Sequence, residues 1–138
     1  MTRFLSVVLV LALAPAVASA SPAREALLEG YAAEAKAQDP AFGGFSAARG
    51  EELFRTRWAK GDERTPACTA CHTDDPRQPG RNAKTGRPID PVAVSVVADR
   101  FTDGEKVEKQ FRRDCDSVLG RACTALEKGD YITFMMGK

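Results

Sequence analysis

The chain has 138 residues, with 20 lysines and arginines against 19 aspartates and glutamates, so its formal net charge at pH 7 is +1. This balance argues against a nucleic-acid-binding surface, which carries an excess of basic residues. A chain of this length forms one domain with a modest hydrophobic core.

The first twenty residues have the pattern of a secretory signal peptide. Arg3 provides a positive charge, an apolar segment spans residues 4–14, and Ala18-Ser19-Ala20 resembles a cleavage site. The apolar segment is shorter than the roughly 20 residues that a membrane-spanning helix requires. We therefore expect a signal peptide over residues 1–20, cleaved near Ala20.

Cleavage is expected to leave one domain, residues 21–138, in the periplasm. Loss of Arg3 equalises the numbers of basic and acidic residues, so the mature net charge is near zero. No second apolar segment of spanning length follows, which predicts no membrane span after cleavage. An oxidising compartment also permits disulfide bonds.

Two helices are predicted in the first part of the mature chain. Pro22 favours a helix start, and the first helix is expected over residues 22–37. Its apolar face consists of Leu27, Leu28, Tyr31 and Ala35. Ser46 caps a second helix over residues 47–54. Gly50 inside this helix costs roughly 1 kcal/mol relative to alanine, which close approach of another helix would offset.

The segment Cys68-Thr69-Ala70-Cys71-His72 has the spacing of a c-type haem attachment site. Two thiols on one turn can reach the two vinyl groups of a haem and form thioether bonds. His72, the only histidine of the chain, can then present an imidazole nitrogen to the iron. The sequence thus predicts one covalently bound haem c, held by Cys68, Cys71 and His72.

Two other interpretations of these cysteines remain open. Cys68 and Cys71 could form a redox dithiol, although such sites need a βαβ setting that the sequence lacks. Together with Cys115 and Cys123 they could instead hold zinc. The second pair is spaced too widely for a zinc knuckle, however, and the histidine would then have no role.

Prolines and glycines predict a long irregular loop over residues 74–91. A loop of this length in a compact domain is usually functional, and wrapping the edge of a haem is one such function. Lys84, Arg87 and Arg100 are candidates for neutralising haem propionates.

Two more helices are expected after this loop. A capping box beginning at Thr102 opens the first, and a second capping box, from Thr124 to Glu127, opens the last. The face of the first contains Val107, Phe111, Asp114 and Cys115. The buried side of the last contains Tyr131, Phe134 and Met135. No strand of consequence is predicted, so the fold class is all-α.

Cys115 and Cys123 lie between these two helices, eight positions apart. A disulfide that closes this loop would contribute about 2.5 kcal/mol by the chain-entropy model. Two free thiols fit an exported protein less well. We therefore expect a Cys115–Cys123 disulfide.

The sixth ligand of the iron decides whether such a protein carries electrons or binds small molecules. Met135 and Met136 are the methionines left after cleavage, but only two residues follow them, so we interpret them as core or surface residues. Asp114 is the candidate distal ligand. A carboxylate on an apolar face must find a cation or a proton, and the cation could be ferric iron, Arg112 or Arg113.

The chain resembles the Sphaeroides haem protein family, a group of high-spin, oxygen-binding monohaem cytochromes c, over residues 27 to 135. The resemblance is carried by Cys68-Thr69-Ala70-Cys71-His72, Thr85-Gly86-Arg87, Arg100-Phe101-Thr102-Asp103, Val107-Glu108-Lys109, Gly120-Arg121-Ala122-Cys123-Thr124 and Glu127-Lys128. Its specific part is the pair of cysteines eight positions apart that bracket Gly120-Arg121.

The resemblance implies a class I-like cytochrome c fold, with helices packed around one haem. His72 would be the proximal ligand, and the Cys115–Cys123 disulfide would lie near the distal face. Gly50 and Phe54 would meet Tyr131 and Phe134 where two core helices cross. A dihaem cytochrome c and a membrane cytochrome b are the implied electron donors.

The chain departs from the family at the position before the first disulfide cysteine. The family has an asparagine there that binds ferric iron and leaves on reduction, whereas this chain has Asp114. A carboxylate is a harder, anionic ligand, which favours ferric iron and should also dissociate on reduction. Alternatively, Asp114 stays unbound, or a protonated Asp114 donates a hydrogen bond to bound oxygen.

The sequence therefore predicts an exported c-type cytochrome that accepts an electron and binds a diatomic molecule, oxygen or nitric oxide, at ferrous iron. The alternatives are an electron carrier ligated by Met135 or Met136, and a zinc or dithiol module without haem. No second general acid or base stands beside Asp114, so catalytic turnover is not expected.

Overall fold

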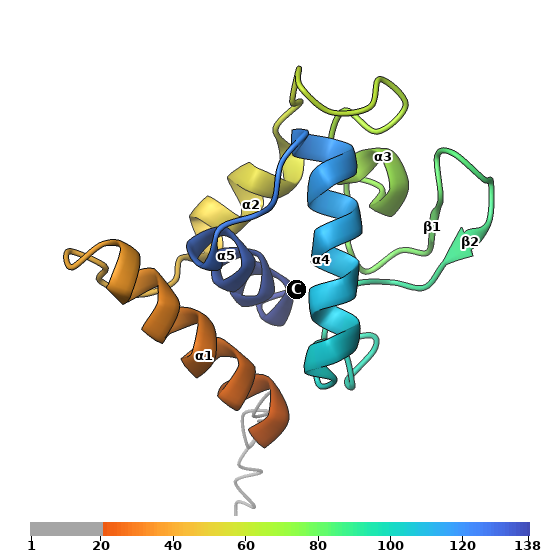
Figure 1. Cartoon of the computed structure of the whole chain (residues 1–138). Helices are drawn as coiled ribbons and strands as arrows, with labels where there is room; N and C mark the ends of the chain where they lie inside the picture. The colour runs from red at the N-terminus through yellow and green to blue at the C-terminus, as the bar shows by residue number, and fades with distance from the viewer. Residues whose placement is uncertain (1–20) are drawn as a thin grey trace, which may run out of the picture.

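The computed structural model describes residues 21–138, and the expected signal peptide at residues 1–20 lies outside this range. Within the described residues the architecture is mainly helical, which confirms the all-α prediction (Figure 1). The helices are α1 (Pro22–Gln38), α2 (Ala47–Arg55), α3 (Thr69–His72), α4 (Gly104–Leu119) and α5 (Ala125–Met136). Two short antiparallel strands, β1 (Gly80–Arg81) and β2 (Pro88–Ile89), lie in the expected loop.

The helix starts follow the expected caps, with one correction. The α5 capping box is present, because the Thr124 side chain accepts from the Glu127 N–H and the Glu127 carboxylate accepts from the Thr124 N–H. The cap of α4 is Asp103 and not Thr102: the Asp103 carboxylate accepts from the Lys106 N–H at 3.1 Å. The Thr102 hydroxyl instead donates to the Asp99 carbonyl at 2.7 Å.

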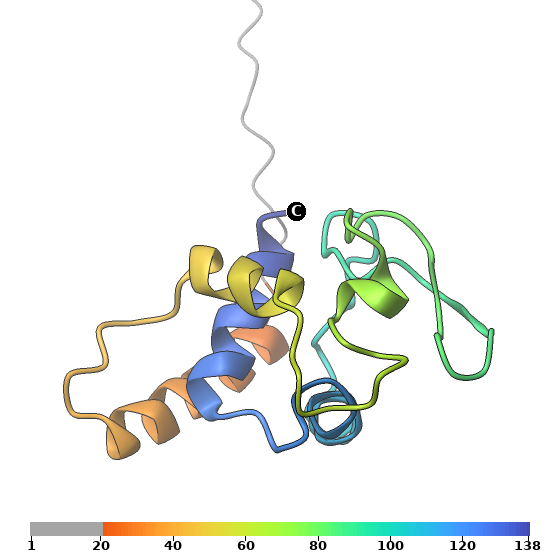
Figure 2. The same cartoon turned by 90° about the horizontal axis from the view of Figure 1, so that it is seen from above.

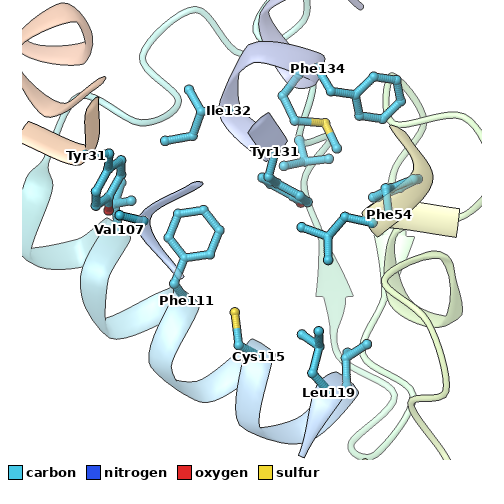
Figure 3. Close-up of a cluster of buried hydrophobic side chains, with 14 of the residues drawn as sticks. Tyr31, Phe54, Val107, Phe111, Cys115, Leu119, Tyr131, Ile132 and Phe134 are labelled. Atoms are coloured by element: carbon cyan, nitrogen blue, oxygen red, sulfur yellow. The ribbon is translucent and has the colours of Figure 1, made fainter. Parts of the chain in front are cut away.

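The core lies where α2 and α5 cross, with α1 beside α5 and α4 on the other side of the buried side chains (Figures 2 and 3). Gly50 makes this crossing possible. A Cβ at Gly50 would overlap the Asp130 carbonyl and lie 2.8 Å from the Phe134 Cβ. The expected close approach of a second helix at Gly50 is therefore confirmed.

Phe54 completes the crossing one turn after the glycine. Its fully buried ring lies 6.2 Å from the ring of Tyr131 and 5.7 Å from that of Phe134, measured between centroids. These are the partners that the family resemblance implies for Phe54. The distances fall within the range of favourable aromatic pairs.

A buried carboxylate that the sequence did not reveal, paired with the half-exposed Arg49, ties the start of α2 to α5. Asp130 is 3% exposed, and its carboxylate accepts hydrogen bonds from the Ser46 N–H at 2.6 Å and from the Arg49 Nε at 2.7 Å. Because both carboxylate oxygens are satisfied, the charge is tolerated in the core. The contact fixes the rotation of α5 relative to α2.

A second unexpected buried charge connects α1 to the loop before α4. Arg24 is 1% exposed, and its guanidinium donates to the Ala98 carbonyl at 2.6 Å and to the Arg100 carbonyl at 2.9 Å. Both acceptors belong to the loop that leads into α4, so α1 holds that loop in place. Within residues 21–138, no helix has the length and apolar character needed to cross a membrane.

Gly50 and Gly30 give a matched pair of substitutions within helices. Gly50→Ala should lower the free energy of unfolding by about 1–3 kcal/mol, because the added methyl group has no space. Gly30→Ala in α1 should raise it by about 0.5–1 kcal/mol, since Gly30 is exposed and has no atom within 4 Å of an added Cβ. Denaturant unfolding measures both values, and a change of the same sign in both variants would contradict the proposed crossing.

Candidate functional site

A cavity of about 1010 Å³ lies between the Cys68–His72 segment, the loop before α4, α4 itself and α5. Its volume is at the upper end of the roughly 300–1,000 Å³ typical of cofactor pockets. Cys68, Cys71 and His72 line it together, as the attachment motif predicts. Asp114 and Phe111 of α4 also line it.

The single turn α3 places the three motif side chains on one wall of the cavity. The Cys71 N–H and the His72 N–H both donate to the Cys68 carbonyl, at 3.2 and 3.1 Å. Gly80 packs against this turn so closely that a Cβ there would overlap the Cys71 carbonyl. On the α2 side, the ring centroid of Phe54 lies 6.5 Å from that of His72. The turn is therefore held from two sides.

The protonation states of the Cys68 thiol and the His72 imidazole suit iron ligation better than thiol redox chemistry. Burial, assisted by the charge of Asp114, raises the pKa of the Cys68 thiol to about 12. Redox-active dithiols have lowered pKa values, so the dithiol interpretation is not favoured. Burial lowers the pKa of His72, which keeps the imidazole neutral and its lone pair available to a metal.

Asp114 projects from α4 into the wall of the same cavity. Its side chain is 39% exposed, so it is less buried than its helical position predicts. Phe111 and Cys115 also line the cavity, but they are buried at 8% and 4% exposure and pack into the core as well. The carboxylate accepts hydrogen bonds from Gln110 and, at 3.0 Å, from the Arg113 Nε. Arg113 is one of the two arginines expected to offset its charge.

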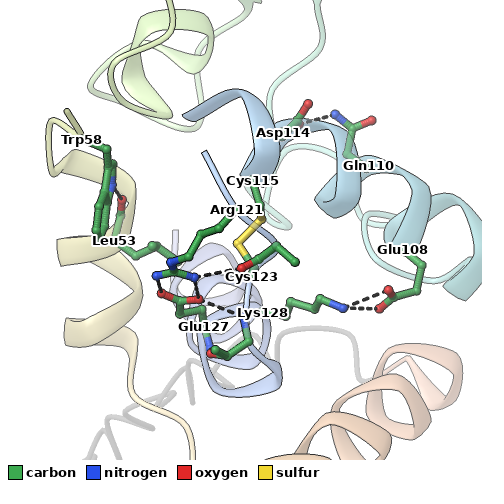
Figure 4. The surroundings of a disulfide bond; sticks show 12 residues. Leu53, Trp58, Glu108, Gln110, Asp114, Cys115, Arg121, Cys123, Glu127 and Lys128 are labelled. Carbon is green, nitrogen blue, oxygen red and sulfur yellow. Dashed lines mark hydrogen bonds and ion pairs between the residues drawn. A yellow bond between two sulfur atoms is a disulfide. The ribbon is translucent and has the colours of Figure 1, made fainter. Parts of the chain in front are cut away.

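Cys115 and Cys123 form a disulfide that joins α4 to the segment before α5 (Figure 4). Arg121 stabilises this segment, because its guanidinium donates two hydrogen bonds to the Glu127 carboxylate, at 2.8 and 2.6 Å. The disulfide leaves Cys68 and Cys71 as the free thiols of residues 21–138. Because Cys115 and Cys123 are bonded to each other, they are not free to bind zinc together with Cys68 and Cys71.

The two methionines do not line the cavity. Met135 is fully buried in the core, and Met136 is 37% exposed. Their positions agree with the interpretation of one core and one surface methionine. The conventional electron-carrier alternative would require one of them to reach the cavity.

The three basic candidates for the propionates, Lys84, Arg87 and Arg100, all line the cavity. Lys84 pairs with Asp62 at 3.0 Å, and the Arg100 Nε donates to the Pro91 carbonyl at 2.9 Å. Arg100 therefore shapes the loop at the cavity edge in addition to carrying charge.

Tyr131 and Phe101 are among the lining residues that the sequence does not mark as site residues. The sequence places Tyr131 on the buried side of the last helix, and in the structure it lies in the cavity wall as well. Phe101 lines the cavity with a φ of 62°, in the left-handed region that a phenylalanine seldom adopts. No local sequence signal predicts that conformation, because it depends on the contacts of the whole loop.

Two thiols, a neutral imidazole and a large, partly apolar cavity form a donor set that fits a c-type haem. Cys68 and Cys71 would hold its edge, and His72 would bind the iron. Comparison with known proteins supports a haem c cofactor.

A family described as a domain of unknown function, DUF1924, matches residues 40–135. The chain is 45% identical over 136 residues to the cytochrome c-type protein SHP of Cereibacter sphaeroides, covering 98% of each sequence. It is 33% identical over 112 residues to cytochrome c'' of Methylophilus methylotrophus, covering 81% of this chain and 78% of that protein.

Solved structures agree with these sequence matches. Oxidised SHP, described as an oxygen-binding cytochrome c, has a TM-score of 0.75 and 38% identity, over 83% of this chain and 96% of its own. Oxidised cytochrome c'' of Methylophilus methylotrophus has a TM-score of 0.71 and 32% identity, over 84% and 94% of the two chains. The fold is therefore the class I-like cytochrome c fold, and the cofactor of the family is haem c. The chain belongs to the Sphaeroides haem protein family of c-type cytochromes.

Proposed function

We propose that this protein is an exported monohaem cytochrome c that accepts an electron and then binds a diatomic molecule, oxygen or nitric oxide. One observation carries the proposal: the α4 wall of the cavity contains no methionine, and its candidate iron ligand is the carboxylate of Asp114. The description of the relative SHP as oxygen-binding supports it. Reduced haem iron without a strong sixth ligand binds small diatomic molecules.

The motif residues have separate roles in this proposal. The Cys68 and Cys71 thiols each form one thioether bond, so one haem is attached covalently. His72 is the proximal ligand, and its neutral state leaves a lone pair for the iron. The Cys115–Cys123 disulfide holds the adjoining end of α4 and so stabilises the opposite wall.

Asp114 is the proposed displaceable ligand of the ferric state. An anionic oxygen ligand stabilises ferric iron more than ferrous iron, so reduction weakens its hold. Gln110 and Arg113 are placed to receive the carboxylate after it leaves, since both donate to it in this structure. We assign no residue a catalytic role.

Export and electron supply complete the proposal. Residues 1–20 would act as the signal peptide, with cleavage near Ala20 and release into the periplasm. A dihaem cytochrome c and a membrane cytochrome b are the proposed electron donors, on the basis of the family resemblance. We propose no nucleic-acid partner, because the net charge expected for the mature chain is near zero.

The absorption spectrum of the reduced protein tests the open site. Addition of carbon monoxide should change the spectrum rapidly, because no strong ligand competes for the iron. The change should reach a plateau as the carbon monoxide concentration rises. A control addition to the ferric protein should change nothing, since carbon monoxide does not bind ferric haem. A low-spin ferrous spectrum that carbon monoxide leaves unchanged would rule out the proposal.

Asp114→Ala tests the displaceable ligand. The ferric spectrum should shift towards that of a water-ligated or five-coordinate haem, and the ferrous spectrum should stay the same. Glu105→Ala is the control, because Glu105 is an exposed carboxylate of α4 outside the cavity. Identical ferric spectra of the wild type and Asp114→Ala would show that Asp114 is not an iron ligand and only forms an ion pair with Arg113.

A double Met135→Leu, Met136→Leu variant tests the electron-carrier alternative. Both spectra should be nearly unchanged, because neither side chain lines the cavity. Replacement of buried Met135 by leucine conserves volume and should lower the free energy of unfolding by less than about 1.5 kcal/mol. Loss of a low-spin signal in this variant, with the protein still folded by circular dichroism, would favour a methionine ligand.

A further inference from the structure

Tyr131 of α5 is a buried phenol in the wall of the haem cavity. It is 8% exposed, and no hydrogen bond to its hydroxyl is formed within residues 21–138. In the same range, no side-chain nitrogen or oxygen is both fully enclosed and without a partner. The Tyr131 hydroxyl must therefore open onto the cavity that this residue lines. Buried hydroxyl groups normally have a hydrogen-bond partner. Since this hydroxyl has none in the part of the chain that the structure describes, it can donate a hydrogen bond to a molecule bound in the cavity.

Three aromatic rings fix the orientation of Tyr131. Its centroid lies 5.6 Å from that of Phe111 and 6.2 Å from that of Phe101, both in near-perpendicular, edge-on arrangements. Phe54 lies 6.2 Å away on the side of α2 (Figure 3). The phenol therefore stands between the wall that carries His72 and the wall formed by α4, with little freedom to turn.

The hydroxyl is a hydrogen-bond donor under all ordinary conditions. Burial, with the nearby Cys68 and Asp114 adding to the effect, raises the pKa of Tyr131 well above its usual range. The Asp114 carboxylate, in contrast, already accepts from Gln110 and Arg113. Tyr131 is thus the buried neutral donor at this end of the cavity.

We propose that the Tyr131 hydroxyl donates a hydrogen bond to the diatomic ligand and so favours oxygen and nitric oxide over carbon monoxide. This assignment rests on the proposed function, because it needs a ligand on the α4 side of the haem. A diatomic molecule on reduced iron accepts hydrogen bonds at its outer atom, and oxygen and nitric oxide do so more strongly than carbon monoxide. Tyr131 is then a specificity-determining residue.

Tyr131→Phe and Tyr31→Phe form a matched pair of variants. Each removes one hydroxyl group from a buried tyrosine of the same aromatic cluster. The Tyr31 hydroxyl donates to Glu108, and Tyr31 does not line the cavity. Only the first variant should therefore affect a ligand inside the cavity.

Two measurements on the reduced holoprotein test the assignment. Tyr131→Phe should raise the C–O stretching frequency of bound carbon monoxide, and it should speed oxygen dissociation about tenfold, as expected for the loss of one hydrogen bond. Tyr31→Phe should leave both values at those of the wild type.

The outcomes separate this assignment from the proposed function. A wild type that binds carbon monoxide, with the same stretching frequency and oxygen dissociation rate in Tyr131→Phe, would overturn the role of Tyr131 alone. Equal changes in Tyr131→Phe and Tyr31→Phe would also overturn it, because the effect would then come from looser aromatic packing. A wild type that binds neither gas would overturn the proposed function together with this assignment.

Discussion

The close contact between α2 and α5 is the constraint on which the rest of the structure depends. Gly50 lets the two backbones approach, and Phe54 one turn later then meets both Tyr131 and the ring of His72. A single crossing thus sets the position of His72 and of the phenol in the cavity wall. A larger residue at the crossing would move both, although it lies outside the cavity.

The opposite wall depends on covalent and ionic links rather than on close backbone packing. The Cys115–Cys123 disulfide joins the end of α4 to the segment before α5. Glu108, in the middle of α4, accepts hydrogen bonds from Lys128 of α5 and from Tyr31 of α1. These contacts join α4 to α1 and α5 along its first half, and to the segment before α5 at its end.

Sequence reasoning predicted the elements well because most signals were local. The haem motif, the helix limits and the Thr124 cap each depend on a few adjacent residues. The predicted cap of α4 was wrong by one residue. Asp103 and Thr102 can both cap a helix, and the geometry of the preceding loop decides which one does. The exposure of Asp114 and the left-handed Phe101 could not be predicted, because they depend on the shape of the cavity and on long-range contacts.

The buried guanidinium of Arg24 has a consequence for the motions of the domain. Its acceptors are two carbonyls of the loop that carries Phe101, so α1 cannot detach without removing the hydrogen-bond donor of both carbonyls. The N-terminal helix and the rim beside α4 are therefore expected to open together, so that their most protected amide protons report the same free energy of opening. The rim of the cavity is thus held in place by a helix that contributes no residue to the cavity wall.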